Sequence, residues 1–138
     1  MSVWSELDVL DKVCDALRGV TIANPSGHHL GRPYMTAYQL AIKLDRDHPE
    51  VARTLGVAVG GSGVGRHTSL AQYLARELSQ RIGREGEVYP VEGAFLSNDH
   101  VTALTYATPD GTTITSSRPG TGLDLSMFRL RAQVPVQS

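Results

Sequence analysis

The chain has 138 residues, of which 41% are hydrophobic and 20% are charged, and its formal net charge is −1. This length and composition are typical of one soluble domain that builds its own core. Because the net charge is close to zero, the whole chain has no general attraction for nucleic acid or membranes, and any basic surface must be local.

Cys14 is the single cysteine, which excludes an intrachain disulfide and a cysteine-based zinc site. The first residues lack the basic and apolar stretches of a secretory signal. No apolar segment approaches the roughly 20 residues that are needed to span a bilayer. A cytoplasmic protein without membrane association is therefore expected.

Residues 1–86 are expected to form the helical part of a single domain. Apolar residues recur at helical spacing from behind Ser5, the predicted N-cap, to about Arg18, and Gly19 is the expected stop. Residues 21–34 contain two prolines and two glycines and predict a loop.

Two shorter helices are expected next. Thr36 is the predicted cap of a helix from residue 37 to about 44, and Pro49 begins a short helix that ends at Leu55. Residues 55–59 fit either the end of that helix or a short strand.

The most strongly periodic segment is the predicted helix 69–82, capped by Thr68 or Ser69 and stopped by Gly83. Its leucines form a broad apolar face. Polar residues at helical spacing lie on another face, and they are Ser69, Gln72, Arg76 and Ser79.

Residues 87–134 are expected to be β structure, with residues 135–138 as a tail. Residues 88–91 are extended, and Pro90 would confine them to a sheet edge because proline has no N–H to donate. Residues 100–108 and 112–117 predict a hairpin around the turn at 109–111. Residues 123–134 supply a last strand.

A helical bundle followed by a β-hairpin is an α+β arrangement that resembles a winged helix-turn-helix. In that fold the last helix enters the major groove of DNA and the hairpin, or wing, touches the adjoining backbone. Residues 66–84 contain four arginines and one glutamate, a local charge of +3. The resemblance implies DNA binding, with transcriptional regulation as its setting. The expected contacts are Arg66, His67, Ser69, Gln72, Arg76, Arg81 and Arg118.

Two other interpretations stay open. The same fold serves as a non-catalytic protein-interaction or regulatory module, including a homodimer formed through the first helix. The glycine-rich segment at 60–65 also has the glycine spacing of a phosphate-binding loop, but Arg66 and His67 stand where a P-loop NTPase needs lysine and serine or threonine. It therefore predicts simple anion binding at 60–69. The residues of that alternative are Gly60, Gly61, Ser62, Gly63, Gly65, Arg66 and Thr68.

Catalysis, metal binding and a cofactor are not expected. Adjacent His28 and His29 would face opposite ways on a strand and do not easily share one metal ion. The sequence has no nucleophile elbow and no zinc-protease motif. The run 97–99, Ser-Asn-Asp, is read as a turn.

Overall fold

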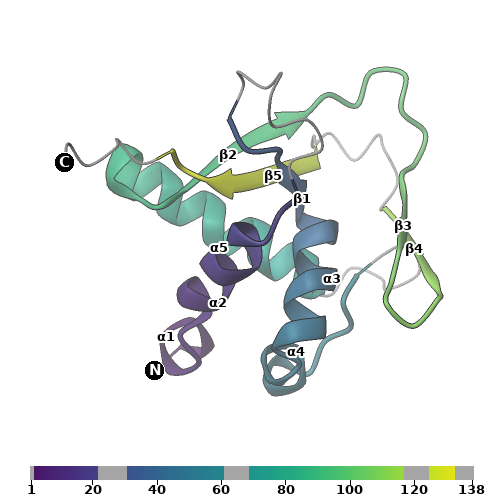
Figure 1. The fold of residues 1–138 in the computed structure, drawn as a ribbon, viewed down its shortest axis with the longest axis horizontal. Helices are drawn as coiled ribbons and strands as arrows, with labels where there is room; N and C mark the ends of the chain where they lie inside the picture. The colour runs from purple at the N-terminus through teal and green to yellow at the C-terminus, as the bar shows by residue number, and fades with distance from the viewer. Residues whose placement is uncertain (1, 22–30, 61–68, 117–124, 133–138) are drawn as a thin grey trace.

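The computed structural model describes residues 2–21, 31–60, 69–116 and 125–132, which form a mixed α+β fold (Figure 1). The elements in chain order are helices α1 (Val3–Glu6) and α2 (Val9–Arg18), strand β1 (Met35–Thr36), helices α3 (Ala37–Asp47), α4 (Glu50–Leu55) and α5 (Leu70–Glu85), the 3-10 helix η2 (Gly86–Val88), and strands β2 (Val91–Leu96), β3 (Thr105–Ala107), β4 (Thr113–Thr115) and β5 (Leu125–Leu130).

The predicted first helix is two helices. The chain breaks at Asp8, whose φ of 49° and ψ of 50° are left-handed, a conformation that aspartate tolerates better than most residues. Ser2 is the N-cap of α1, with its hydroxyl accepting from the N–H of Ser5, so the predicted cap at Ser5 is wrong. The predicted end of the helical segment, Gly19, is confirmed as the C-cap of α2.

Helix α3 begins behind Thr36 as predicted. Thr36 and Gln39 form a reciprocal capping box, in which each side chain accepts from the other residue's backbone N–H. The helix continues to Asp47 and not to residue 44. Helix α4 ends at Gly56, which has a left-handed φ of 71°, and residues 57–60 belong to no strand, so the strand alternative for 55–59 is wrong.

The main sheet has three antiparallel strands in the order β1-β5-β2. Strand β1 was not predicted; it lies between α2 and α3 in the chain and pairs with β5, with Met35 opposite Phe128. On the other side β5 pairs with β2, with Gly93 opposite Phe128. Strand β2 is at the edge, where Pro90 predicted an edge strand, although the strand covers 91–96 and not 88–91.

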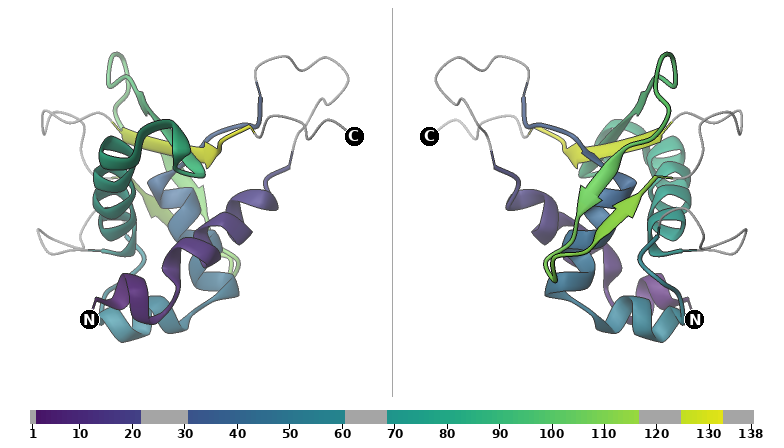
Figure 2. Two further views of the ribbon diagram at one scale, coloured as in Figure 1. Left: turned by 90° about the vertical axis from the view of Figure 1, so that its left-hand side faces the viewer. Right: turned by 90° about the vertical axis from the view of Figure 1, so that its right-hand side faces the viewer.

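The predicted hairpin is confirmed around the turn at 109–111, but its strands β3 and β4 are short and form a sheet of their own. The prediction treated this hairpin as the wing. In the structure it lies beside α3 (Figure 2). The Tyr106 ring stacks on Tyr38 of α3, with 5.5 Å between the ring centroids. The hairpin was therefore located correctly, while its separation from the main sheet was not foreseen.

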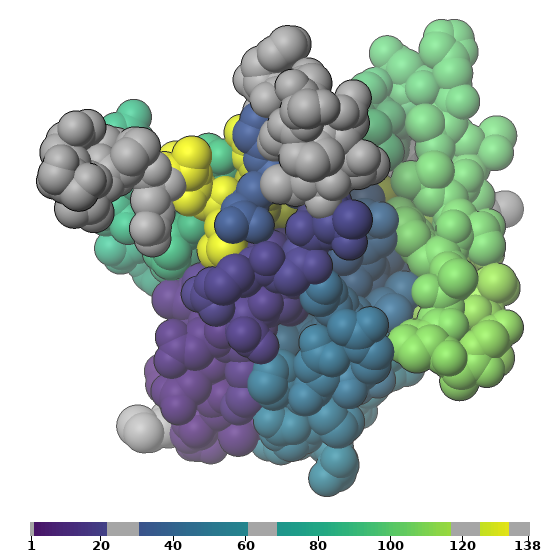
Figure 3. All heavy atoms as spheres, viewed as in Figure 1, coloured from purple at the N-terminus to yellow at the C-terminus, as the bar shows by residue number. Residues whose placement is uncertain are grey.

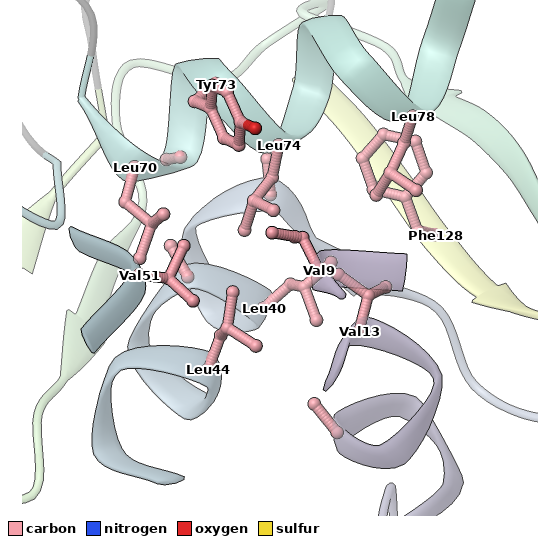
Figure 4. Packing of buried hydrophobic residues seen from close by; sticks show 14 of the residues in the cluster. Val9, Val13, Leu40, Leu44, Val51, Leu70, Tyr73, Leu74, Leu78 and Phe128 are labelled. Atoms are coloured by element: carbon pink, nitrogen blue, oxygen red, sulfur yellow. The ribbon is translucent and has the colours of Figure 1, made fainter. Parts of the chain in front are cut away.

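The core lies between α5, the helices α2 and α3, and the inner face of the sheet (Figure 4). Each fully buried large side chain stabilises the fold by about 1.5–3 kcal/mol relative to an exposed one. The central members are Val13, Leu40, Leu44, Leu74, Leu78 and Phe128, all at 0–1% exposure. Within the described residues, no helix is long and apolar enough to cross a bilayer.

Candidate functional site

Helix α5 presents a polar face away from the core. Leu70, Leu74 and Leu78 are buried against the core, so the opposite side of the helix is open. At about 100° per residue, positions 72, 76, 79 and 83 fall within about 60° of one another on that side. The exposed residues of the helix are Gln72, Arg76, Ser79, Gln80, Gly83, Arg84 and Glu85.

Ser69 has a structural task. It is buried, at 3% exposure, and its hydroxyl accepts from the N–H of Gln72 at 3.1 Å. The Gln72 side-chain oxygen accepts from the N–H of Ser69 at 3.3 Å, which completes a capping box. Ser69 is thus placed as a helix cap and not on the exposed face. Gln72 is exposed, and its amide oxygen is the acceptor for the Ser69 N–H.

Arg76 and Arg81 differ in how firmly they are held. The Arg76 side chain is 49% exposed, with its Nε 3.6 Å from the Glu77 carboxylate. Arg81 is 20% exposed, its guanidinium lies 4.3 Å from the centre of the Trp4 ring, and its Nη1 is 2.6 Å from Glu77. The Arg76 guanidinium also lies 5.8 Å from the centre of the Tyr73 ring. Arg76 is the more exposed of the two arginines, whereas Arg81 joins α5 to α1.

The helix is longer than the sequence predicts, and this adds a residue that borders the exposed face. Gly83 lies inside α5, where the predicted stop is wrong, and the helix ends at Gly86 with a φ of 65°. Gln80 already lies in the predicted helix and borders the exposed face, whereas Arg84 is added beyond Gly83 and lies about 120° round the helix from Gln72. The signal for Arg84 was the continuing run of helix-forming residues on both sides of Gly83.

The charges of this helix are arranged unevenly. The side chains of Arg76 and Arg84 are 49% and 65% exposed. Glu77 is 19% exposed and pairs with Arg81 at the side of the helix. Glu85 lies 3.8 Å from Arg84 at the very end of the helix. The middle of the exposed face, from residue 72 to 83, therefore carries a positive group and neutral hydrogen-bonding groups.

The start of α5 is anchored by the chain that precedes the glycine-rich segment. The N–H groups of Leu70 and Ala71 donate to the carbonyls of Ala58 and Val59 at 2.8 and 2.9 Å. Gly60 has a φ of 152°, and a Cβ there would lie 3.2 Å from atoms of Ala71 and Tyr38. With the Gln72 N–H bound to Ser69, the first donors of the helix are occupied by the protein.

This occupancy bears on the anion-binding alternative, because phosphate loops combine loop N–H groups with free N–H groups of a helix start. An anion would have to be held by the loop itself. Of that set only Gly60 is described; Gly61, Ser62, Gly63, Gly65, Arg66 and Thr68 lie outside the described residues. The predicted DNA contacts Arg66, His67 and Arg118 lie outside them too.

In comparisons with protein-family models, curated proteins and solved structures, no match to this chain was found. Its function is therefore argued from its own geometry. Within the described part of the chain, no three His, Cys, Asp or Glu side chains are grouped to hold a metal ion. The exposed face of α5 is the candidate site, because the sequence predicts Gln72 and Arg76 as contacts and the structure leaves both exposed.

Proposed function

We propose that this protein binds DNA as a winged helix-turn-helix, with the exposed face of α5 in the major groove. The observation that carries the proposal is the sheet order β1-β5-β2, with β1 between α2 and α3. A winged helix joins its helices to a sheet in this way, with the strand between the first two helices pairing with the last strand. The arrangement backs one side of α5 with the core, and the described residues on its other side, among them Gln72, Arg76 and Ser79, are exposed.

The chemistry of the exposed face suits base edges and phosphates. Arginine pairs with the two acceptors of guanine. The amide nitrogen of Gln72 can donate to a base acceptor, while its oxygen accepts from the Ser69 N–H. Arg76 and Gln72 are one helical turn apart near the start of α5, the part of a recognition helix that contacts bases. Arg84 lies at the far end of α5, about 120° round the helix from Gln72, where it borders the exposed face and can contact a phosphate at the edge of the groove.

Binding to a mixed-sequence duplex tests the proposal when it is measured at about 50 and 200 mM salt, because phosphate contacts release counterions. We expect wild-type affinity to fall steeply with salt. The double variant Arg76→Ala/Arg84→Ala should bind more weakly and should flatten the salt dependence by a slope of about 1, because Arg84 is assigned a phosphate contact and Arg76 a base contact. Absence of binding at the lower salt would refute the proposal.

The matched control is Arg53→Ala. Arg53 is exposed on α4, and it carries the same charge as the two test residues. It should leave both affinity and salt slope close to wild type. An equal loss in Arg53→Ala would show that the binding follows net charge and not the face of α5.

A protein-interaction module of the same fold is the second candidate, and one observation favours it. Phe95 is 67% exposed at the end of β2, on an edge strand whose outer side has no partner strand among the described residues. Exposed aromatic residues are enriched at protein interfaces. For this candidate we expect a salt-insensitive self-association, measured by light scattering, that Phe95→Ser abolishes and Arg76→Ala leaves unchanged.

A further inference from the structure

A cleft of about 800 Å³ lies at the opposite end of the fold from the hairpin β3–β4. It is bordered by the end of α2, the segment that leads into β1, the turn from η2 to β2 and the end of β5. Figure 3 shows the yellow end of β5 beside the blue segment that precedes β1, above α2. We name it the arginine cleft for its lining residues Arg18, Arg32 and Arg131.

The three arginines come from segments far apart in the chain. Arg32 donates to the backbone carbonyl of Arg18 at 3.4 Å, which brings their segments together. Arg131 donates from Nε to the carbonyl of Tyr89 at 2.9 Å and so fixes the other wall. The fold therefore gathers three positive charges around one cavity.

The acidic groups near these arginines do not neutralise the cleft. Asp15 is 3.6 Å from Arg18, but both side chains are 63% exposed, and solvent screens such a pair. Glu92 is 3.4 Å from Arg131 and also binds Arg129 at 2.7 Å. Among the described lining residues, three are arginines and one, Glu87, is acidic, a formal charge of +2. The charge is +1 when Arg129, Asp15 and Glu92 are counted with them. Like charges held together in this way favour an anion between them.

The cleft also has an apolar wall. Val88, Pro90 and Leu130 line it beside the arginines. Val88 is 82% exposed, the most exposed large hydrophobic residue among those described. Small-molecule sites of about 300–1,000 Å³ combine apolar walls with a few converging polar groups, and this cleft has both features.

We propose that the arginine cleft binds a small organic anion, in which a carboxylate or phosphate group is joined to an apolar body. The oxyanion is bound by the guanidinium groups of Arg18 and Arg32, which recognise such groups with paired hydrogen bonds. Arg131 contributes its charge alone, because its three nitrogens already contact Tyr89, Glu92 and Gly86. The apolar body lies on Val88, Pro90 and Leu130. The proposal does not rest on DNA binding, because it uses no residue of the exposed face of α5.

Calorimetric titration of the full chain with four probes tests this site. Benzoate and phenyl phosphate carry both parts of the proposed ligand, while acetate and inorganic phosphate carry the oxyanion alone. We expect one aromatic probe to saturate at millimolar concentrations and to bind at least tenfold more tightly than its small counterpart, because it buries apolar surface. The preferred pair distinguishes a carboxylate ligand from a phosphate ligand.

Two variants locate the binding in the cleft. Arg32→Ala removes one exposed hydrogen bond of 3.4 Å, so it should fold normally and weaken the aromatic probe about tenfold or more. Val88→Ser should weaken the aromatic probe and leave its small counterpart unchanged. Arg53→Ala, on α4, is the charge-matched control.

Three results would overturn the proposal. The first is no saturable binding of either aromatic probe. The second is equal binding of an aromatic probe and its small counterpart, which shows that the apolar wall contributes nothing. The third is an Arg32→Ala variant that binds like the Arg53→Ala control.

Discussion

Ser69 and Ser79 lie on the same predicted face of α5 but have different environments, and their alanine variants should separate a structural role from a binding role. Ser69 is 3% exposed and its hydroxyl accepts from the N–H of Gln72 at 3.1 Å. Ser79 is exposed in the middle of the helix. Removing a serine cap costs about 0.5–2 kcal/mol.

The magnitude for Ser69→Ala should fall in the upper half of that range, about 1–2 kcal/mol, because water cannot easily reach the Gln72 N–H at so buried a position. For a domain of this size that loss lowers the Tm by about 3–7 °C. Ser79→Ala should leave stability unchanged or slightly raised, since alanine is the better helix former. Urea unfolding followed by circular dichroism measures both variants.

DNA titration of the same two variants completes the test. Ser69→Ala should bind DNA like wild type under conditions where it is folded, and Ser79→Ala should bind more weakly. The reasoning is refuted if Ser69→Ala unfolds within about 0.5 kcal/mol of wild type and yet loses DNA affinity, since its hydroxyl would then act as a contact and not as a cap.

Three further changes have expected outcomes. Arg81→Ala should lower the free energy of unfolding by about 1–2 kcal/mol, because Arg81 lies on Trp4 at 4.3 Å and pairs with Glu77 at 2.6 Å; urea unfolding measures it. Threonine hydroxyls and a backbone N–H lower the pKa of Asp110 to about 2. The stability that it contributes is therefore present above its ordinary pKa of about 4 and is lost as pH falls toward about 2; Asp110→Asn should remove this pH dependence in acid unfolding curves. Tyr89→Phe should raise the free energy of unfolding by about 1 kcal/mol, since its buried hydroxyl has no hydrogen-bond partner among the described residues; thermal unfolding measures it.

Each of these has its own control and contrary result. Arg76→Ala, with its mostly exposed side chain, should change stability by less than about 0.5 kcal/mol; equal losses in both arginine variants would contradict the role given to Arg81. An unchanged acid unfolding curve for Asp110→Asn would mean that the carboxylate contributes nothing to folding. A clear loss of stability in Tyr89→Phe would show that its hydroxyl is paired in the folded protein.

The sequence predicted the parts of the fold that depend on local patterns. Helix α5 followed from leucines at helical spacing, and α3 followed from Thr36 as a cap. The turn at 109–111 carries a proline, an aspartate and a glycine, each of which favours turns. Pro90 predicted an edge strand over 88–91 because it lacks an N–H, and the strand that forms, at 91–96, lies at an edge although it does not contain Pro90.

The missed features depend on contacts between distant residues. Strand β1 has two residues, and it is defined by pairing with Phe128 and Met127, which no periodicity encodes. Gly83 was read as a stop, yet the helix continues because its other side packs on the core; an exposed glycine there costs about 1 kcal/mol, which packing offsets. Tertiary packing overrides local preference at both places.

In the candidate site, too, the features that depend on local patterns were predicted and those that depend on distant contacts were missed. Helical spacing identified Gln72 and Arg76, which the structure leaves exposed. It also selected Ser69, because a helical wheel does not show that the chain at 58–60 folds back over the first turn. Arg81 was chosen for its charge, and its contact with Trp4 is invisible in a sequence where the two residues are 77 positions apart.

The two hydrogen bonds from α5 to Ala58 and Val59 have a consequence for how this segment tolerates change in length. They hold the chain before residue 61 beside the chain after residue 68, so both ends of the connection between α4 and α5 are fixed. Doubling the length of a flexible loop costs only about 0.6 kcal/mol of closure entropy. Insertions or deletions between Gly60 and Ser69 should therefore leave the direction of α5 unchanged, and this segment is where the chain can gain or lose residues without moving the face that α5 presents.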